Sequence, residues 1–105
     1  MEIIDFSYYD ENNNLIEVEK IEIDYWYNTN KYQQALLIYK ENKDTVEFAN
    51  KILPEMILSP SNLKEIKTFD NDFEALSDLL TILIEVQTKK LKAQPKKKKP
   101  TLKMQ

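Results

Sequence analysis

The chain has 105 residues, 42% of them apolar, which suits one domain with a single core. It has no Cys, His or Gly, which excludes disulfides and thiolate ligands, removes the commonest general base and zinc ligand, and leaves no usual phosphate-cradling loop. The formal net charge of −3 is segregated, because residues 1–88 carry seven lysines against all eighteen acidic residues, a net −11, whereas residues 89–105 carry eight lysines and no acid.

The first 26 residues have the pattern of a β-hairpin. Residues 2–9 are mostly β-branched and aromatic, and residues 10–14 suit a tight turn because their asparagines tolerate a positive φ. In residues 15–26 apolar side chains recur at every second position, with one slip at Glu19–Lys20 that predicts a β-bulge or a bend. The acidic side chains of this second strand should mostly face water: Glu17, Glu19, Glu22 and Asp24.

Two short helices are expected next. Residues 28–30 can cap the first, whose inward face has helical spacing. Its members are Tyr32, Ala35, Leu36 and Tyr39. After a break at Asn42–Lys43, Asp44 and Glu47 form a capping box that starts the second helix, and Pro54 ends or kinks it. The second helix should bury Val46, Ala49 and Leu53.

Residues 55–69 are less regular. Ile57–Leu58 either continues the helix or runs extended. Ser59–Pro60 is a good pair for starting a short helix through Leu63 and Ile66.

A long last helix is the clearest element of the sequence. Asn71 and Glu74 form another capping box, and Pro95 should stop the helix at about Lys92 or Ala93. A broad apolar stripe follows the cap: Phe73, Leu76, Leu79, Leu80, Ile82, Leu83 and Val86. The fold class is therefore α+β, with an N-terminal antiparallel β-hairpin followed by three to four α-helices, as one domain over residues 1–93 and a disordered Lys-rich tail over residues 94–105.

The acidic residues invite a reading as catalytic or metal-binding groups. Glu17, Glu19, Glu22 and Asp24 could be paired acids of a hydrolase or ligands of a hard cation, but no third ligand loop and no glycine turn support this. Asp70, Asp72 and Asp78 raise the same question, and acids at a helix start explain the first two. We therefore expect no catalytic residues, no metal and no cofactor.

The aromatic residues allow two interpretations. Tyr25, Trp26 and Tyr27, beside Tyr8 and Tyr9, could stack nucleotides, but the surrounding acidic residues repel phosphate and disfavour nucleic acid. Packing under the hairpin is the simpler interpretation. Trp26 and Tyr27 are nonetheless candidates for anchoring a protein partner, because interface hot spots are rich in Trp and Tyr.

No secretory or membrane segment is apparent. The start, Met-Glu-Ile-Ile-Asp, lacks the basic and apolar regions of a signal peptide. The longest apolar stretch is interrupted by Asp78, Thr81 and Glu85, far short of a membrane span. We expect a protein that works in a reducing cytoplasm without a membrane partner.

The order of the segments resembles the tail assembly chaperones of long-tailed, siphovirus-like bacteriophages. The resemblance covers about residues 30–90 and lies in the apolar spacing of Phe48–Leu53, Ile57–Pro60 and Phe73–Val86. It implies a chaperone that binds tape-measure or tail-tube protein in the host cytoplasm during tail morphogenesis, with Leu79, Ile82, Leu83 and Val86 as contact residues. The N-terminal hairpin has no counterpart in this resemblance.

The run Lys96–Lys99 has three interpretations. It can bind polyanions weakly and with strong salt dependence, or it can be a solvated end without a binding role. Members of the chaperone family are commonly made in two lengths by ribosomal frameshifting, and adenine-rich lysine codons are what such a slippery site contains. The sequence leaves these alternatives open, together with homo-oligomerisation.

Two other function classes remain. A small acidic inhibitor, such as an anti-defence protein that imitates nucleic acid and binds a host protein, would use the net −11 of residues 1–88. An enzyme that relies on carboxylates alone is the third hypothesis.

Overall fold

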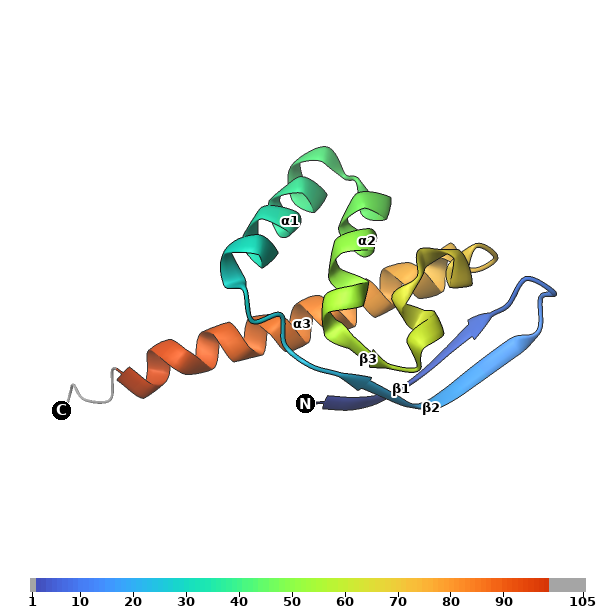
Figure 1. The fold of residues 1–105 in the computed structure, drawn as a ribbon, viewed down its shortest axis with the longest axis horizontal. Coiled ribbons are helices and arrows are strands. Elements are labelled where there is room, and N and C mark those ends of the chain that lie inside the picture. Colours follow the sequence, from blue (N-terminus) through green and yellow to red (C-terminus); the bar gives the residue numbers. More distant parts are fainter. Residues whose placement is uncertain (1, 99–105) are drawn as a thin grey trace.

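The computed structural model describes the backbone of residues 2–98 and the side chains of residues 2–90. Its fold is α+β, an N-terminal antiparallel hairpin followed by three α-helices, which confirms the predicted fold class (Figure 1). The elements in chain order are β1 (Glu2–Tyr9), β2 (Leu15–Ile23), α1 (Thr29–Asn42), α2 (Thr45–Met56), β3 (Ile57–Ser59), the 3₁₀ segments η1 (Ser61–Lys64) and η2 (Ile66–Phe69), and α3 (Phe73–Lys98).

The hairpin turn is held by its own polar side chains. The carboxylate of Asp10 accepts the backbone N–H groups of Asn12 and Asn14, both at 2.9 Å. Asn13 has a φ of 65°, the left-handed conformation that asparagine tolerates better than most residues. The predicted turn at residues 10–14 is therefore confirmed.

A β-bulge interrupts the hairpin where the sequence predicted it. Ile4 pairs with Ile21 and Phe6 pairs with Val18, so Glu19 and Lys20 lie opposite the single residue between Ile4 and Phe6. The extra residue restores the inward orientation of the apolar side chains after the slip in the alternation.

The sheet has a third strand. Pairing of Glu22 with Ser59 and of Ile23 with Ile57 adds β3 to the hairpin in the order β1-β2-β3. Residues 57–58 are therefore extended, one of the two conformations left open by the sequence. The short helix expected after Ser59–Pro60 is instead two 3₁₀ segments separated by the extended residue Glu65, and each segment buries one large apolar side chain.

The first two helices begin and break as predicted. The side chain of Asn28 accepts the N–H of Lys31 at 3.1 Å, and that of Asp44 accepts the N–H of Glu47 at 3.0 Å. Lys43, with a φ of 57°, ends α1. The prediction for Val46 was wrong, since its side chain is 50% exposed because it lies in the first turn of α2, at the edge of the core.

The start and the end of α3 both differ from the prediction. The capping side chain is Asp72, not Asn71, because the Asp72 carboxylate accepts the N–H of Ala75 at 3.0 Å. The helix continues to Lys98 and includes Pro95. Proline removes one backbone hydrogen bond, which kinks or weakens a helix without having to end it. The disordered tail predicted for residues 94–105 falls largely on residues 99–105, which lie outside the described residues.

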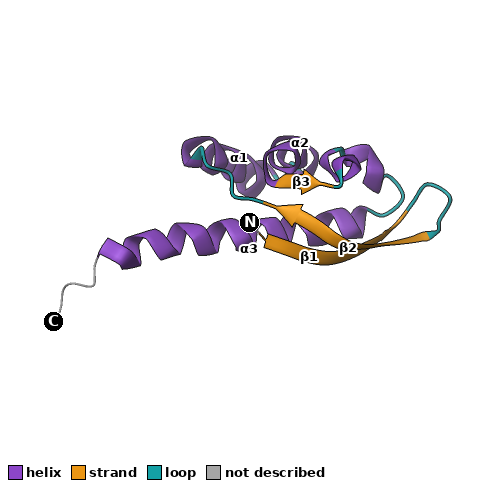
Figure 2. Ribbon diagram, turned by 60° about the horizontal axis from the view of Figure 1, so that its bottom comes forward, coloured by secondary structure: helices purple, strands orange, loops and turns teal. Residues whose placement is uncertain are grey.

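The core lies where the inner face of the sheet meets α2 and α3. Figures 1 and 2 show α3 as a long rod, with the hairpin and the α1–α2 pair packed on different sides of it. The side chains without exposed surface include Ile21, Ile23, Phe48, Ile52, Leu53, Met56, Ile57, Leu63, Leu76, Leu79, Leu80 and Leu83. Among the described residues, none of the helices has the length and apolar character needed to cross a membrane.

Candidate protein-interaction surfaces

Four of the six predicted partner-binding residues are buried. Leu79 and Leu83 have no exposed surface, and Trp26 and Val86 are almost completely covered. Apart from Phe73 and the half-buried Ile82, the apolar stripe of α3 faces the core and is not an exposed patch, because the hairpin and α2 cover it. Of the remaining two, Tyr27 is 66% exposed, and Ile82 is half-buried against the core.

Trp26 is fixed to α3 by the side chain of Gln87. The backbone N–H of Trp26 donates to Gln87 Oε1 at 2.9 Å, and Gln87 Nε2 donates to the Trp26 carbonyl oxygen at 3.0 Å. The indole packs edge-on against Tyr32, with ring centres 5.9 Å apart. Trp26 therefore joins the end of the sheet to α3. Gln87 was missed, although its position four residues after Leu83 placed a polar side chain on the core face of the helix.

The tyrosines on either side of Trp26 surround a lysine. Lys90 Nζ lies 4.6 Å from the ring centre of Tyr25 and 5.1 Å from that of Tyr27. The Tyr27 hydroxyl donates to Asp24 Oδ1 at 3.2 Å, and this hydrogen bond is the main reason that the pKa of Tyr27 is raised. The Lys90 ammonium thus already occupies the aromatic surface considered for nucleotide stacking.

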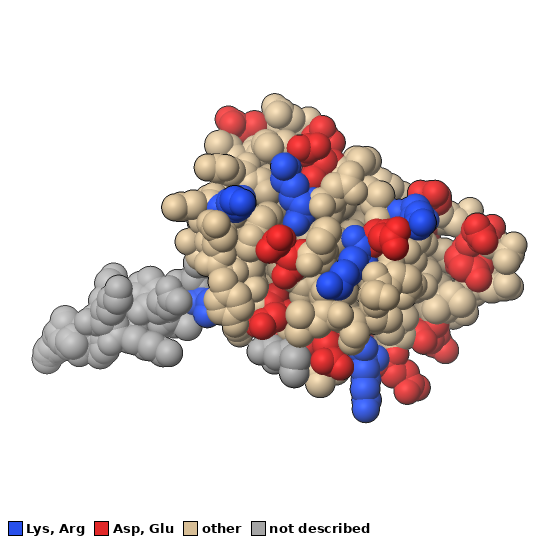
Figure 3. Space-filling view, in the orientation of Figure 1, with Lys and Arg blue, Asp and Glu red and all other residues tan. Residues whose placement is uncertain are grey.

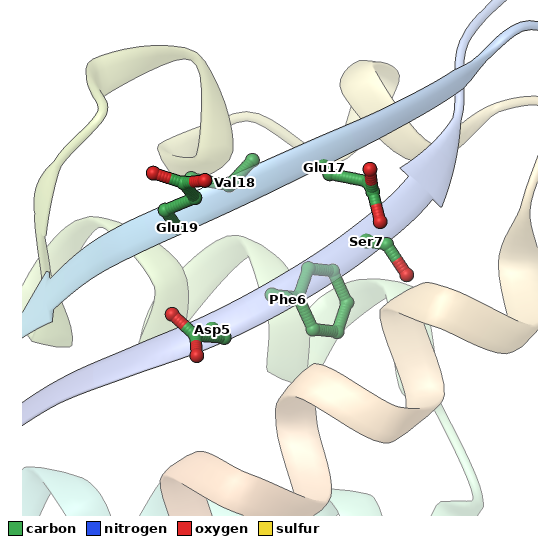
Figure 4. A pocket seen from close by; sticks show the side chains of 6 residues that line it. All are labelled: Asp5, Phe6, Ser7, Glu17, Val18 and Glu19. Atoms are coloured by element: carbon green, nitrogen blue, oxygen red, sulfur yellow. The ribbon is translucent and has the colours of Figure 1, made fainter.

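The predicted acidic strand face is real but does not form one cluster. Figure 4 shows Asp5, Glu17 and Glu19 on the hairpin around the bulge, where they line a shallow hollow of 370 Å³ with Ser7. Glu22 and Asp24 lie further along the chain and are half-buried. Within residues 2–90, no group of three or more acidic side chains is placed to hold a metal ion.

Acidic residues gather towards the hairpin. In Figure 3 many of them lie at the hairpin end and along the lower edge of the molecule, where one lysine also projects, and others lie near the top with lysines between them. The hairpin therefore presents mainly negative charge to a partner approaching from that side.

An apolar pocket opens between the starts of α2 and α3. It has a volume of 330 Å³ and is lined by Val46, Ile66, Phe69, Asp70, Phe73 and Leu76. Two of its side chains, Val46 and Phe73, are 50% and 53% exposed. Half-exposed apolar side chains that line a pocket are typical of sites where a partner buries an apolar side chain. This pocket was missed because the sequence placed both exposed residues on buried helix faces.

Comparison with known proteins identifies no relative. No protein-family model, no curated protein and no solved structure matches the chain.

Proposed function

We propose that this chain is a phage tail assembly chaperone that binds tape-measure or tail-tube protein in the host cytoplasm until the tail assembles. The observation that carries the proposal is the apolar pocket with its two half-exposed side chains, Val46 and Phe73. A partner that inserts an apolar side chain there removes this surface from water, which contributes about 25 cal/mol for each Å² buried.

The shape of the pocket suits a helical client segment. Its lining comes from α2, η2 and α3, and Asp70 is its one charged residue. An amphipathic helix presents apolar side chains at positions i and i+4, so one side chain can fill the pocket while the next contacts Phe73. Such segments aggregate when they are left free, and protecting them is the role of a chaperone.

The resemblance to tail assembly chaperones supports the same surface. The segments that carry it, Phe48–Leu53 and Phe73–Val86, belong to α2 and α3. Each of these helices contributes one of the half-exposed pocket residues from its first turn.

The decisive experiment is co-expression of the tagged chain with the tape-measure and tail-tube proteins of the genome that encodes it. Wild-type chain should retain one of them, identified by mass spectrometry. Phe73→Glu should lower the retained amount at least about tenfold, because a carboxylate at the pocket cannot be buried without a partner. Leu37→Glu is the matched control, since Leu37 is 56% exposed on α1 and lies outside the pocket.

Circular dichroism establishes that both variants are folded. The proposal fails if wild-type chain retains neither protein, or if Phe73→Glu retains its client as well as Leu37→Glu does.

The acidic hairpin supports a second candidate, an inhibitor that imitates nucleic acid. Asp5, Glu17 and Glu19 lie on one side of the hairpin, as phosphates do along one side of a nucleic-acid strand. Binding to a basic host nuclease should then weaken steeply with salt and should be lost in Glu17→Lys/Glu19→Lys. The single substitution Glu41→Lys, on α1, provides a control away from the hairpin. Binding that does not respond to salt argues against this function.

A further inference from the structure

A groove runs between β1 and α3. Asp5, Phe6 and Ser7 of β1 line one side, and Asp78, Thr81 and Ile82 of α3 line the other, around a volume of 470 Å³. Within the described part of the chain, β1 has a strand on one side only, because the sheet order is β1-β2-β3. The groove therefore follows an open strand edge with a helix beside it, an arrangement that suits the addition of an extended peptide.

The backbone of β1 offers hydrogen-bonding groups to this edge. The N–H of Tyr9 donates to Asp72 Oδ2 at 3.0 Å instead of to β2, so it points towards the α3 side. Backbone groups of an antiparallel strand repeat their direction every second residue, which places those of Ser7 on the same edge. Asp72 closes one end of the edge, and the groove beyond it remains open.

Both sides of the groove combine the same two kinds of side chain. Asp5 and Asp78 bring negative charge, whereas Phe6 and Ile82 bring apolar surface. An occupant should therefore bring both positive charge and apolar side chains to the groove. Residues 99–105, Lys-Pro-Thr-Leu-Lys-Met-Gln, carry both kinds, because Lys99 and Lys103 are basic and Leu102 and Met104 are apolar.

The segment cannot fill the groove of its own chain. Twenty helical residues separate Asp78 from Lys98, a distance of about 30 Å along α3. Seven extended residues span at most about 25 Å, which only reaches the near end of the groove at Ile82, about 24 Å from Lys98, and leaves none to lie along β1. We propose that residues 99–105 of one copy add as a strand to β1 of a second copy, so that the basic segment of each molecule binds the acidic hairpin side of another.

Sedimentation velocity on the full chain tests this association, over a concentration series that reaches about 1 mM, the range of weak complexes. Wild-type chain should self-associate. Its association constant should fall at least about fivefold between 50 and 300 mM salt, because this change roughly halves the Debye length and so weakens each ion pair. Deleting residues 99–105 should lower the association constant about tenfold or more, and so should Asp78→Lys.

Two control variants separate the groove from other surfaces. Glu41→Lys makes the same change of charge on α1 and should leave the association within about twofold of wild type. Phe73→Glu alters the apolar pocket and should also leave the self-association unchanged. A failed client-binding experiment therefore does not decide whether the chain self-associates.

A synthetic peptide of residues 99–105 tests the mode of binding. It should compete with self-association, whereas the same peptide with N-methyl groups on alternate backbone amides should not, because strand addition needs those N–H groups. The inference is overturned if wild-type chain stays monomeric throughout the series. It is also overturned if self-association survives deletion of residues 99–105, or if both peptides compete equally.

Discussion

At the scale of single residues, two buried polar side chains differ in whether their hydrogen bonds are made. Gln87 is buried with both ends of its amide bonded to the backbone of Trp26, 61 residues away. The Tyr32 hydroxyl is also buried but makes no hydrogen bond of ordinary geometry, and Thr88 is the polar group beside it. A buried polar group stabilises a fold only when its hydrogen bonds are made, so these two residues should respond oppositely to replacement.

Replacing Gln87 with Met should lower the free energy of unfolding by about 2–4 kcal/mol, because the N–H and the carbonyl of Trp26 both lose their partner while they stay buried. Urea denaturation followed by Trp26 fluorescence measures the change. Gln33→Met, at an exposed position of α1, should change stability by less than about 0.5 kcal/mol. Equal effects of the two substitutions would contradict the role of the Gln87 amide.

Replacing Tyr32 with Phe should leave stability at pH 7 unchanged or raise it, because it removes a buried hydroxyl that makes no hydrogen bond of ordinary geometry. Tyr8→Phe should instead cost about 1 kcal/mol, since the Tyr8 hydroxyl accepts a hydrogen bond from Asn62 Nδ2 at 3.1 Å. Urea denaturation of the two variants gives the comparison, and a larger loss in Tyr32→Phe than in Tyr8→Phe contradicts it.

The same Tyr32 variant should alter the response to alkaline pH. Burial raises the pKa of the Tyr32 hydroxyl above its ordinary value of 10.0. The folded state then holds this proton more tightly than the unfolded state, so its contribution is complete below pH 10 and is lost as pH rises beyond 10. Tyr32→Phe should lose less stability than wild type between pH 9 and pH 11. Parallel curves for the two proteins would show that the pKa of the Tyr32 hydroxyl is the same in the folded and the unfolded state.

At the scale of elements, capping was predicted well except at α3. The cap of α1 was placed within residues 28–30 and that of α2 at Asp44, because a capping side chain bonds an N–H three residues ahead, which is a local relation. At α3 the predicted cap was Asn71, but the next residue, Asp72, is also of a type that caps helices. Asp72 caps because its second oxygen also accepts the N–H of Tyr9, while Asn71 donates to the carbonyl of Asp10 at 2.9 Å. The hairpin therefore decides which of the two residues caps the helix.

Asp72→Ala should cost about 1.5–3 kcal/mol, because α3 loses its cap and the edge of β1 loses a hydrogen bond to a charged group. Asp72→Asn keeps the capping oxygen and should cost less than half of this. Thermal unfolding of Asp72→Ala, Asp72→Asn and Asn71→Ala ranks the three. If Asn71→Ala proves the most damaging, Asn71 is the main cap after all.

At the scale of the whole molecule, the helices are unequally anchored. Five side chains of α2 are buried, whereas α1 buries only Tyr32 and Ala35. A helix with little buried surface opens locally at a lower cost than the rest of the fold. We therefore regard β2, α2 and α3 as the stable frame and α1 as its least stable part.

Hydrogen exchange should show this difference directly. Amides in the centre of α1 should exchange roughly tenfold or more faster than those in the centre of α2, because α1 can detach without opening the core. Exchange of both helices at one common rate would mean that the domain opens only as a unit.

The sequence by itself determined the elements whose causes are local. Alternation and a turn of asparagines predict the hairpin, the slip at Glu19–Lys20 predicts its bulge, and two of the helix caps follow from residue spacing. These features depend on residues within a few positions of one another, so a pattern along the chain is enough to find them.

Only the tertiary structure decided which surfaces are covered. It buried Trp26, Leu79, Leu83 and Val86 and left Val46 and Phe73 half-exposed around a pocket. The physical reason is that the hydrophobic effect has no direction, so an apolar side chain is buried wherever elements distant in sequence meet. Periodicity shows which residues share a helix face, but it carries no information about where that helix projects past its neighbours.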